Sequence, residues 1–203
     1  MANEEVNNGR RRFLTATTAT VGAIGTGFAA YAFLNTLPPG ASQQSAGAPV
    51  NLDISKIDME NGMLIKTKWR GQPIFVFKRS AEQMAALGQH DARLKDPNSE
   101  NPDQTPAFAK NPSRTLADRP DIAVLVAFCT HLGCIPLHVP QISSQVFDQD
   151  WPGGFYCPCH NSRFDLAGRV FDGSPAPTNL MVPPYHFLSE TVIQLGVAPE
   201  GAV

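Results

Sequence analysis

All four cysteines of the chain lie in two short motifs, and each motif also contains a histidine. The first motif is CTHLGC, residues 129–134, and the second is CPCHNSRFD, residues 157–165. Together they provide six potential metal ligands: Cys129, His131, Cys134, Cys157, Cys159 and His160. A tetrahedral zinc site needs only about four. If an exported domain joins one cysteine of each motif in a disulfide, two thiolates and two imidazoles are left for zinc or for a 2Fe-2S cluster.

The spacing of these residues favours the iron-sulfur cluster over structural zinc. Paired zinc ligands usually have two or more residues between them, and the histidines of a zinc finger are about three to five residues apart. Here each motif instead mixes one cysteine with one histidine, as Cys129-x-His131 and Cys157-x-x-His160. With two irons, each loop can give its cysteine to one iron and its histidine to the other, which is the mixed ligation of Rieske centres.

The two motifs and the sequence GRVFDGSPAPTNLMVPPY after them resemble the Rieske iron-sulfur subunit of the cytochrome bc complex, ubiquinol:cytochrome c oxidoreductase. The resemblance covers the N-terminal apolar segment and most of residues 50–200. It implies one 2Fe-2S cluster whose inner iron is bound by Cys129 and Cys157 and whose outer iron is bound by His131 and His160. It also implies a disulfide between Cys134 and Cys159, a pair that Rieske ferredoxins and oxygenase domains generally lack.

The resemblance also assigns residues that surround and tune this cluster. The sequence GSPAPTN reads by itself as an ordinary turn, whereas the family places a Pro loop there, over the third side of the cluster. Ser162 keeps a hydroxyl that can donate to a bridging sulfide, but Phe164 stands where many members have tyrosine, so a second hydroxyl donor is missing. Asn161 replaces a glycine and tolerates a left-handed backbone. The Pro loop comprises Gly173, Ser174, Pro175, Ala176 and Pro177.

The implied function is electron transfer in a quinol-oxidising complex. Replacing two thiolates by neutral imidazoles raises the reduction potential of a cluster, so the site suits an electron acceptor for quinol. The resemblance assigns the quinol contact and the proton chiefly to His160, with His131 beside it. It implies cytochrome b and a c-type cytochrome as partners in a dimeric complex. The net charge of −2, without a basic stripe, argues against nucleic-acid binding.

Two other functions fit parts of the sequence. One is the small Rieske subunit of a periplasmic molybdenum oxidase such as arsenite oxidase, which can also have a twin-arginine signal. The other is a zinc-stabilised exported binding module without redox activity. The long match through GSPAPTNLMVPPY favours the quinol-oxidising complex over both.

The N-terminal region predicts export and membrane anchoring. The sequence GRRRFLT resembles a twin-arginine signal, and an uncharged run follows at residues 15–37. As a helix this run spans about 34 Å, against roughly 30 Å of bilayer hydrocarbon. A retained anchor is favoured over a signal peptide cleaved after Ala48, because the run exceeds a usual signal core and Pro49 follows. We expect residues 1–14 in the cytoplasm of a bacterium and the soluble domain in the periplasm, with one pass through the inner membrane.

The remaining sequence predicts a mainly β protein, and the family resemblance implies a Rieske-type antiparallel β base domain that carries an inserted cluster-binding subdomain. Residues 38–50 read by composition as a linker, either a simple spacer or, as the resemblance implies, a flexible hinge. The Rieske domain is expected at 51–203, with the cluster subdomain at about 127–180. Two-residue turns predict three hairpins, at Arg70-Gly71, Ala167-Gly168 and Ser189-Glu190. Ser80 and Gln83 predict a capped helix, and DIAVLVAF a buried strand. Residues 89–120 read as a surface insertion, either disordered or in contact with a partner, and His90, His138 and His186 as surface or base-domain residues.

Overall fold

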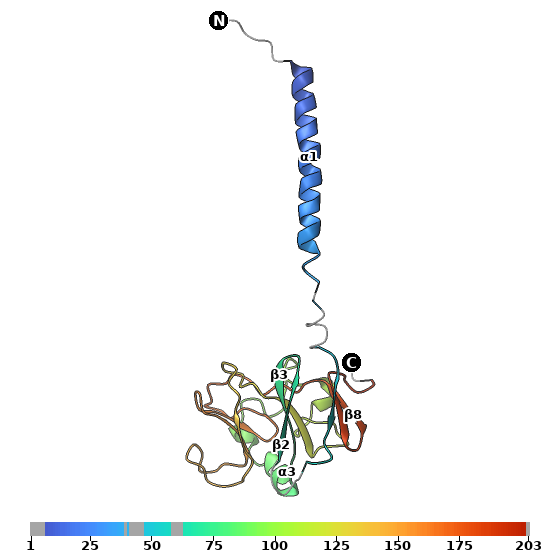
Figure 1. Cartoon of the computed structure of the whole chain (residues 1–203). Helices are drawn as coiled ribbons and strands as arrows, with labels where there is room; N and C mark the ends of the chain where they lie inside the picture. Colours follow the sequence, from blue (N-terminus) through green and yellow to red (C-terminus); the bar gives the residue numbers. More distant parts are fainter. Residues whose placement is uncertain (1–6, 39, 41–46, 58–62, 202–203) are drawn as a thin grey trace. The chain divides into compact units, whose positions relative to one another are not determined.

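The structure is a computed structural model that describes residues 7–38, 40, 47–57 and 63–201. It contains two compact units, Met1–Ser45 and Ala46–Val203 (Figure 1). Most of the expected hinge linker, at 39 and 41–46, lies outside the described residues, as do residues 1–6 of the expected cytoplasmic segment.

One helix, α1 (Asn8–Leu34), accounts for most of the described N-terminal unit. It begins before the uncharged run because the side chain of Asn7 accepts a hydrogen bond from the Arg10 backbone N–H at 3.1 Å. The arginines therefore lie on the same helix as the apolar residues. By length and composition α1 can cross a membrane, and it ends three residues before the end of the predicted run at Leu37.

In the described residues the strands form three antiparallel sheets of three strands each, which confirms the mainly β class. The central sheet comprises β2 (Leu64–Trp69), β3 (Gln72–Lys78) and β4 (Ile122–Val126). The terminal sheet comprises β1 (Val50–Asp53), β9 (Val192–Leu195) and β8 (Tyr185–Ser189). The motif sheet comprises β5 (Leu137–Val139), β6 (Gly154–Cys157) and β7 (Ser162–Asp165), and it is inserted in the chain between β4 and β8.

Two of the three predicted hairpins differ in detail from the sequence prediction. Arg70 and Gly71 both have positive φ, 52° and 74°, so they form the expected two-residue turn between β2 and β3. The loop between β8 and β9 is Glu190-Thr191, one residue later than predicted, because the pairing is irregular between Phe187 and Ser189. The turn at Ala167-Gly168 is present, but Val170 and Phe171 form only isolated bridges rather than a strand.

The predicted capped helix is α3 (Ala81–Leu87). The Ser80 side chain accepts a hydrogen bond from the Gln83 backbone N–H, and the Gln83 side chain accepts one from the Ser80 backbone N–H. This reciprocal pair satisfies two of the backbone donors that a helix N-terminus leaves open, so the capping-box prediction is confirmed.

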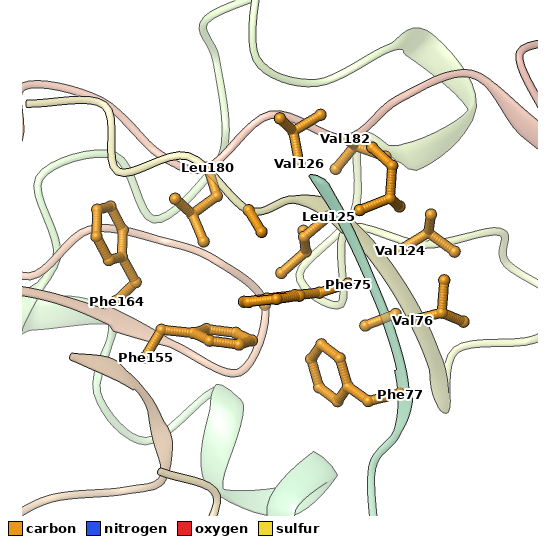
Figure 2. Packing of buried hydrophobic residues seen from close by; sticks show 14 of the residues in the cluster. Phe75, Val76, Phe77, Val124, Leu125, Val126, Phe155, Phe164, Leu180 and Val182 are labelled. Carbon is orange, nitrogen blue, oxygen red and sulfur yellow. The ribbon is translucent and has the colours of Figure 1, made fainter. Parts of the chain in front are cut away.

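Aromatic side chains join the central sheet to the motif sheet. Phe75 of β3 stacks on Phe155 of β6 with ring centroids 5.7 Å apart, and Phe77 meets Phe155 edge to face at 5.5 Å (Figure 2). All three rings are buried, as is every residue of β4. The strands that lead into both cysteine motifs therefore rest on one hydrophobic core, which holds the two motifs at a fixed separation.

Residues 89–120 are more than the predicted surface insertion. They contain two short 3-10 helices, η1 (Asp91–Arg93) and η2 (Ala107–Ala109). Arg114 is buried, and its guanidinium donates hydrogen bonds to the carbonyl oxygens of Ala167 at 2.8 Å and Leu180 at 2.7 Å. The segment is therefore ordered and bonded to the chain that follows the second motif, so the first of the two alternatives for it, disorder, is wrong, and partner contact stays a prediction.

Candidate metal centre

The two cysteine motifs form tight loops at neighbouring strand ends. In the first loop the backbone N–H of Cys129 donates to the carbonyl of Cys134 at 2.8 Å, and Gly133 has a φ of 81° that a residue with a side chain rarely adopts. In the second loop Asn161 has a φ of 64°, and its N–H donates to the carbonyl of Cys157 at 3.0 Å. The expectation that Asn161 keeps a left-handed turn is confirmed.

A disulfide between Cys134 and Cys159 joins the two loops, as the resemblance implied. Cys129 and Cys157 are free thiols, and each is only 2% exposed. Burial raises the pKa of the Cys157 thiol, and its hydrogen bond to Cys129 raises that pKa further. A metal bound at this thiol pair would reverse this shift, because a metal binds cysteine as the thiolate.

The rings of the two motif histidines are in contact with each other. The rings of His131 and His160 lie perpendicular to each other with centroids 4.7 Å apart. His131 is half-buried and His160 is exposed. Two sulfur donors inside and two imidazoles outside fit a 2Fe-2S cluster with one iron bound by cysteines and one by histidines.

A second group of sulfur atoms lies close by. The Sγ atoms of Cys134, Cys157 and Cys159 all lie within 4.8 Å of one another. Two of these sulfurs form the disulfide, so they are not available as thiolate ligands. Their closeness to Cys157 places the disulfide directly beside the free thiols, where it fixes the separation of the two loops.

The predicted Pro loop is hydrogen-bonded to both motifs. The Ala176 N–H donates to Ser162 Oγ at 3.0 Å, and the Arg163 N–H donates to Ser174 Oγ at 3.1 Å. From the first motif, Thr130 Oγ1 donates to the carbonyl of Thr178 at 2.6 Å. The loop thus lies against both ligand loops. Ser162 is fully buried and accepts from Ala176, which leaves its own hydroxyl hydrogen free to donate elsewhere.

Sequence reasoning missed the buried charges under the second motif. Asp165 accepts hydrogen bonds from the N–H groups of Ala167 and Arg169 and forms an ion pair with the Arg169 guanidinium at 2.8 Å. Asp165 and Arg169 are 3% and 0% exposed. The sequence signal that could have predicted this ion pair is the spacing of four residues between Asp165 and Arg169. The pair holds the turn after β7.

The interpretation of His138 as a surface or base-domain residue was wrong. His138 lies on β5 of the motif sheet, and its ring stacks on Phe155 at 5.2 Å and meets Phe77 at 5.1 Å. Its Nε2 is buried and has no hydrogen-bond partner among the described residues. Burial, with a smaller effect from Lys66, lowers the pKa of His138 from 6.5 to about 4. His138 is therefore a half-buried, neutral residue that packs against two core aromatic rings.

Two family models match the chain. A model described as "Ubiquitinol-cytochrome C reductase Fe-S subunit TAT signal" matches residues 1–40, and the "Rieske [2Fe-2S] domain" matches residues 100–186. The second match includes both cysteine motifs and the Pro loop. The first match includes the arginines and the apolar helix, so the N-terminal region fits a single-pass anchor with an exported domain.

Curated relatives match almost the whole chain. The protein named "Ubiquinol-cytochrome c reductase iron-sulfur subunit" of Allochromatium vinosum is 48% identical over 97% of this chain and 92% of its own length. Proteins of the same name from Blastochloris viridis and Bradyrhizobium diazoefficiens are 40% and 38% identical, each over 92% of this chain and over 92% and 94% of their own lengths. The similarity therefore extends over the anchor, the β domain and the metal centre together.

Proposed function

Because the chain belongs to the family of ubiquinol-cytochrome c reductase iron-sulfur subunits, we propose that it accepts electrons from quinol and passes them to a c-type cytochrome. The observation that carries this proposal is the arrangement of donors in the two loops. Two buried free thiols adjoin each other, and two imidazoles meet at the exposed side of the same site. Such a centre can exchange electrons at a surface while its sulfur ligands stay shielded.

Four side chains would hold the cofactor. Cys129 and Cys157, which are buried, would bind the inner iron, and His131 and His160 would bind the outer iron. When bound, the 2Fe-2S cluster supplies a one-electron acceptor of raised potential, since neutral imidazoles replace two thiolates.

His160 is the residue best placed to receive the quinol proton. A histidine that binds metal through one ring nitrogen keeps the other for a hydrogen bond. His160 is exposed, so this second nitrogen, once it has lost its own proton, would be able to accept the hydroxyl hydrogen of a quinol that docks at the surface. His131 is half-buried and packs against the His160 ring, which restricts the orientation of that ring.

The surrounding residues keep the two loops together and shield the inner side. The Cys134–Cys159 disulfide ties one loop to the other. The Pro loop lies against Ser162 through the Ala176 N–H, which leaves the Ser162 hydroxyl hydrogen able to donate to a sulfide of the cluster, if one is bound there. Phe164 is fully buried and provides no second hydroxyl at the family's tyrosine position.

We further propose the cellular setting and the partners. The apolar helix would anchor the protein in the inner membrane of a bacterium, with residues 1–14 in the cytoplasm and residues 51–203 in the periplasm. Residues 38–50 would serve as the hinge between quinol site and cytochrome. The complex would be dimeric and would contain cytochrome b and a c-type cytochrome. The names of the relatives support this setting over the molybdenum oxidase alternative.

The test is single-turnover reduction of the complex purified from native membranes. Addition of a quinol should reduce both the iron-sulfur centre and a c-type haem, as followed by EPR and visible absorbance. A His160→Gln variant should lose this reduction. Co-purification with a molybdenum-containing subunit, and no electron transfer from quinol, would contradict the proposal.

A further inference from the structure

The Pro loop has an unusual contact with a lysine from outside the two motifs. Lys95 Nζ donates hydrogen bonds to two carbonyl oxygens of the loop, that of Ser174 at 2.6 Å and that of Ala176 at 2.9 Å. These carbonyls lie on either side of Pro175. The backbone N–H of Lys95 donates to the carbonyl of Val170 at 3.0 Å, which fixes the base of the side chain. Lys95 therefore binds the loop from a defined position.

The composition of the loop explains why it needs such a partner. Pro175 and Pro177 have no backbone N–H, so the loop has few donors with which to form a turn of its own. Ser174 and Ala176 are nevertheless buried, at 5% and 0% exposure. Buried carbonyl groups without partners are costly. One ammonium group satisfies both of them, and hydrogen bonds from a charged donor are stronger than neutral ones.

The two residues that Lys95 binds are also the ones that contact the second motif. The Ala176 N–H donates to Ser162 Oγ at 3.0 Å, and Ser174 Oγ accepts from the Arg163 N–H at 3.1 Å. Lys95 thus holds the outer side of a loop whose inner side contacts Ser162. A displacement of Ala176 would remove the partner that orients the Ser162 hydroxyl.

The end of the Pro loop is held by the same segment. Asn179 Nδ2 donates to the carbonyl of Asp96 at 3.0 Å, and Asn179 Oδ1 accepts from the Val170 N–H at 2.8 Å. Arg114 donates to the carbonyl of Leu180. Contacts from residues 95–114 therefore fix the chain from Ser174 to Leu180, and Lys95 makes the pair of contacts within the Pro loop itself.

We propose that Lys95 is a positioning residue for the metal centre, which holds the Pro loop against Ser162 and favours the more negative, reduced state of the centre. The electronic part of this inference rests on the proposed function. The structural part does not, because it concerns only the closure of the loop over the second motif. Lys95 is an exposed residue, so its substitution leaves the hydrophobic core intact.

The experiment compares Lys95→Met and Lys95→Arg in the intact protein, with Lys110→Met as the matched control. Lys110 is an exposed lysine of the same segment. Hydrogen exchange of the peptide that contains Ala176 reports loop closure, and redox titration followed by EPR reports the midpoint potential. In Lys95→Met, exchange at Ala176 should be about tenfold faster, as expected for loss of a charge-assisted hydrogen bond, and the potential should fall. Lys95→Arg retains the positive charge and at least two N–H donors. Its exchange rate at Ala176 and its midpoint potential should therefore stay close to those of the unmodified protein.

The two readouts separate the two parts of the inference. Faster exchange in Lys95→Met with an unchanged potential would overturn the effect on the centre but not the positioning of the loop. Exchange and potential that both match the Lys110→Met control would overturn the whole proposal. Loss of the metal centre in Lys95→Met but not in Lys95→Arg would support it, whereas equal loss in both variants would contradict it. Failure of quinol reduction does not affect the exchange measurement.

Discussion

His138 gives a prediction about acid stability that can be worked out from the structure. Its ring lies between Phe77 and Phe155, and its Nε2 has no partner among the described residues. Burial, followed by Lys66, lowers the pKa of His138 from 6.5 to about 4. The unfolded chain therefore binds a proton at a higher pH than the folded chain does. It follows that stability is lost as the pH falls from about 6.5 toward 4.

The size of the loss follows from the same two pKa values. At pH 5 the histidine of the unfolded chain is mostly protonated and that of the folded chain is mostly neutral. Because pH 5 lies about 1.5 units below the pKa of 6.5, protonation stabilises the unfolded chain by about 2 kcal/mol. Since the ring is only half-buried, solvent screening brings the expected loss to about 1–2 kcal/mol. Replacing His138 with phenylalanine keeps an aromatic ring in the stack and removes the titrating group.

The assay is denaturant unfolding of the intact protein, followed by circular dichroism at pH 8 and pH 5. Between these values the unmodified protein should lose about 1–2 kcal/mol more stability than His138→Phe does. The measurement at pH 8 is the internal control, because His138 is neutral there in both folded and unfolded chains. Other groups titrate equally in both proteins and cancel in the comparison. An identical loss in the two proteins would refute the reasoning that His138 is held neutral in the core.

Three further changes test the surroundings of the metal centre. Ser162→Ala should lower the midpoint potential by an amount on the order of tens of millivolts, because it removes a hydrogen bond that favours the more negative, reduced state; for one electron, about 59 mV corresponds to 1.4 kcal/mol. An unchanged potential in redox titration would contradict donation by this hydroxyl. Phe164→Tyr should raise the potential by a similar amount, and a crystal structure that places the phenol beside a cysteine sulfur without a rise would contradict the argument. Cys134→Ser should lower the unfolding free energy by about 2–4 kcal/mol and alter the EPR signal. Retention of native stability and potential in that variant would show that the disulfide has no structural role.

Features encoded by neighbouring residues were predictable from the sequence. The capping box at Ser80 and Gln83 and the turn at Arg70-Gly71 depend only on local backbone chemistry, and both are present. The left-handed conformation of Asn161 follows in the same way. The Cys134–Cys159 disulfide came from the family resemblance rather than from the residues alone, since four cysteines allow several pairings.

Features that depend on distant parts of the chain were not predictable. Residues 89–120 are rich in proline and polar residues, which suggested a loop with little packing. The buried position of Arg114 depends on carbonyl groups 53 and 66 residues away. The hydrogen bonds of the exposed Lys95 side chain reach carbonyls 79 and 81 residues away. His138 is half-buried because Phe77, from another sheet, packs against its ring. The shift of the last turn to Glu190-Thr191 results from an irregularity in strand pairing.

EPR spectroscopy of the natively expressed protein, combined with metal analysis, tests the central claim most directly. Two cysteines and two histidines on one 2Fe-2S cluster should give, after reduction with dithionite, the low average g value of mixed ligation. Iron should be present at about two atoms per chain, and Cys129→Ala should abolish the signal. Stoichiometric zinc without iron, or a signal typical of four cysteine ligands, would contradict the proposed centre.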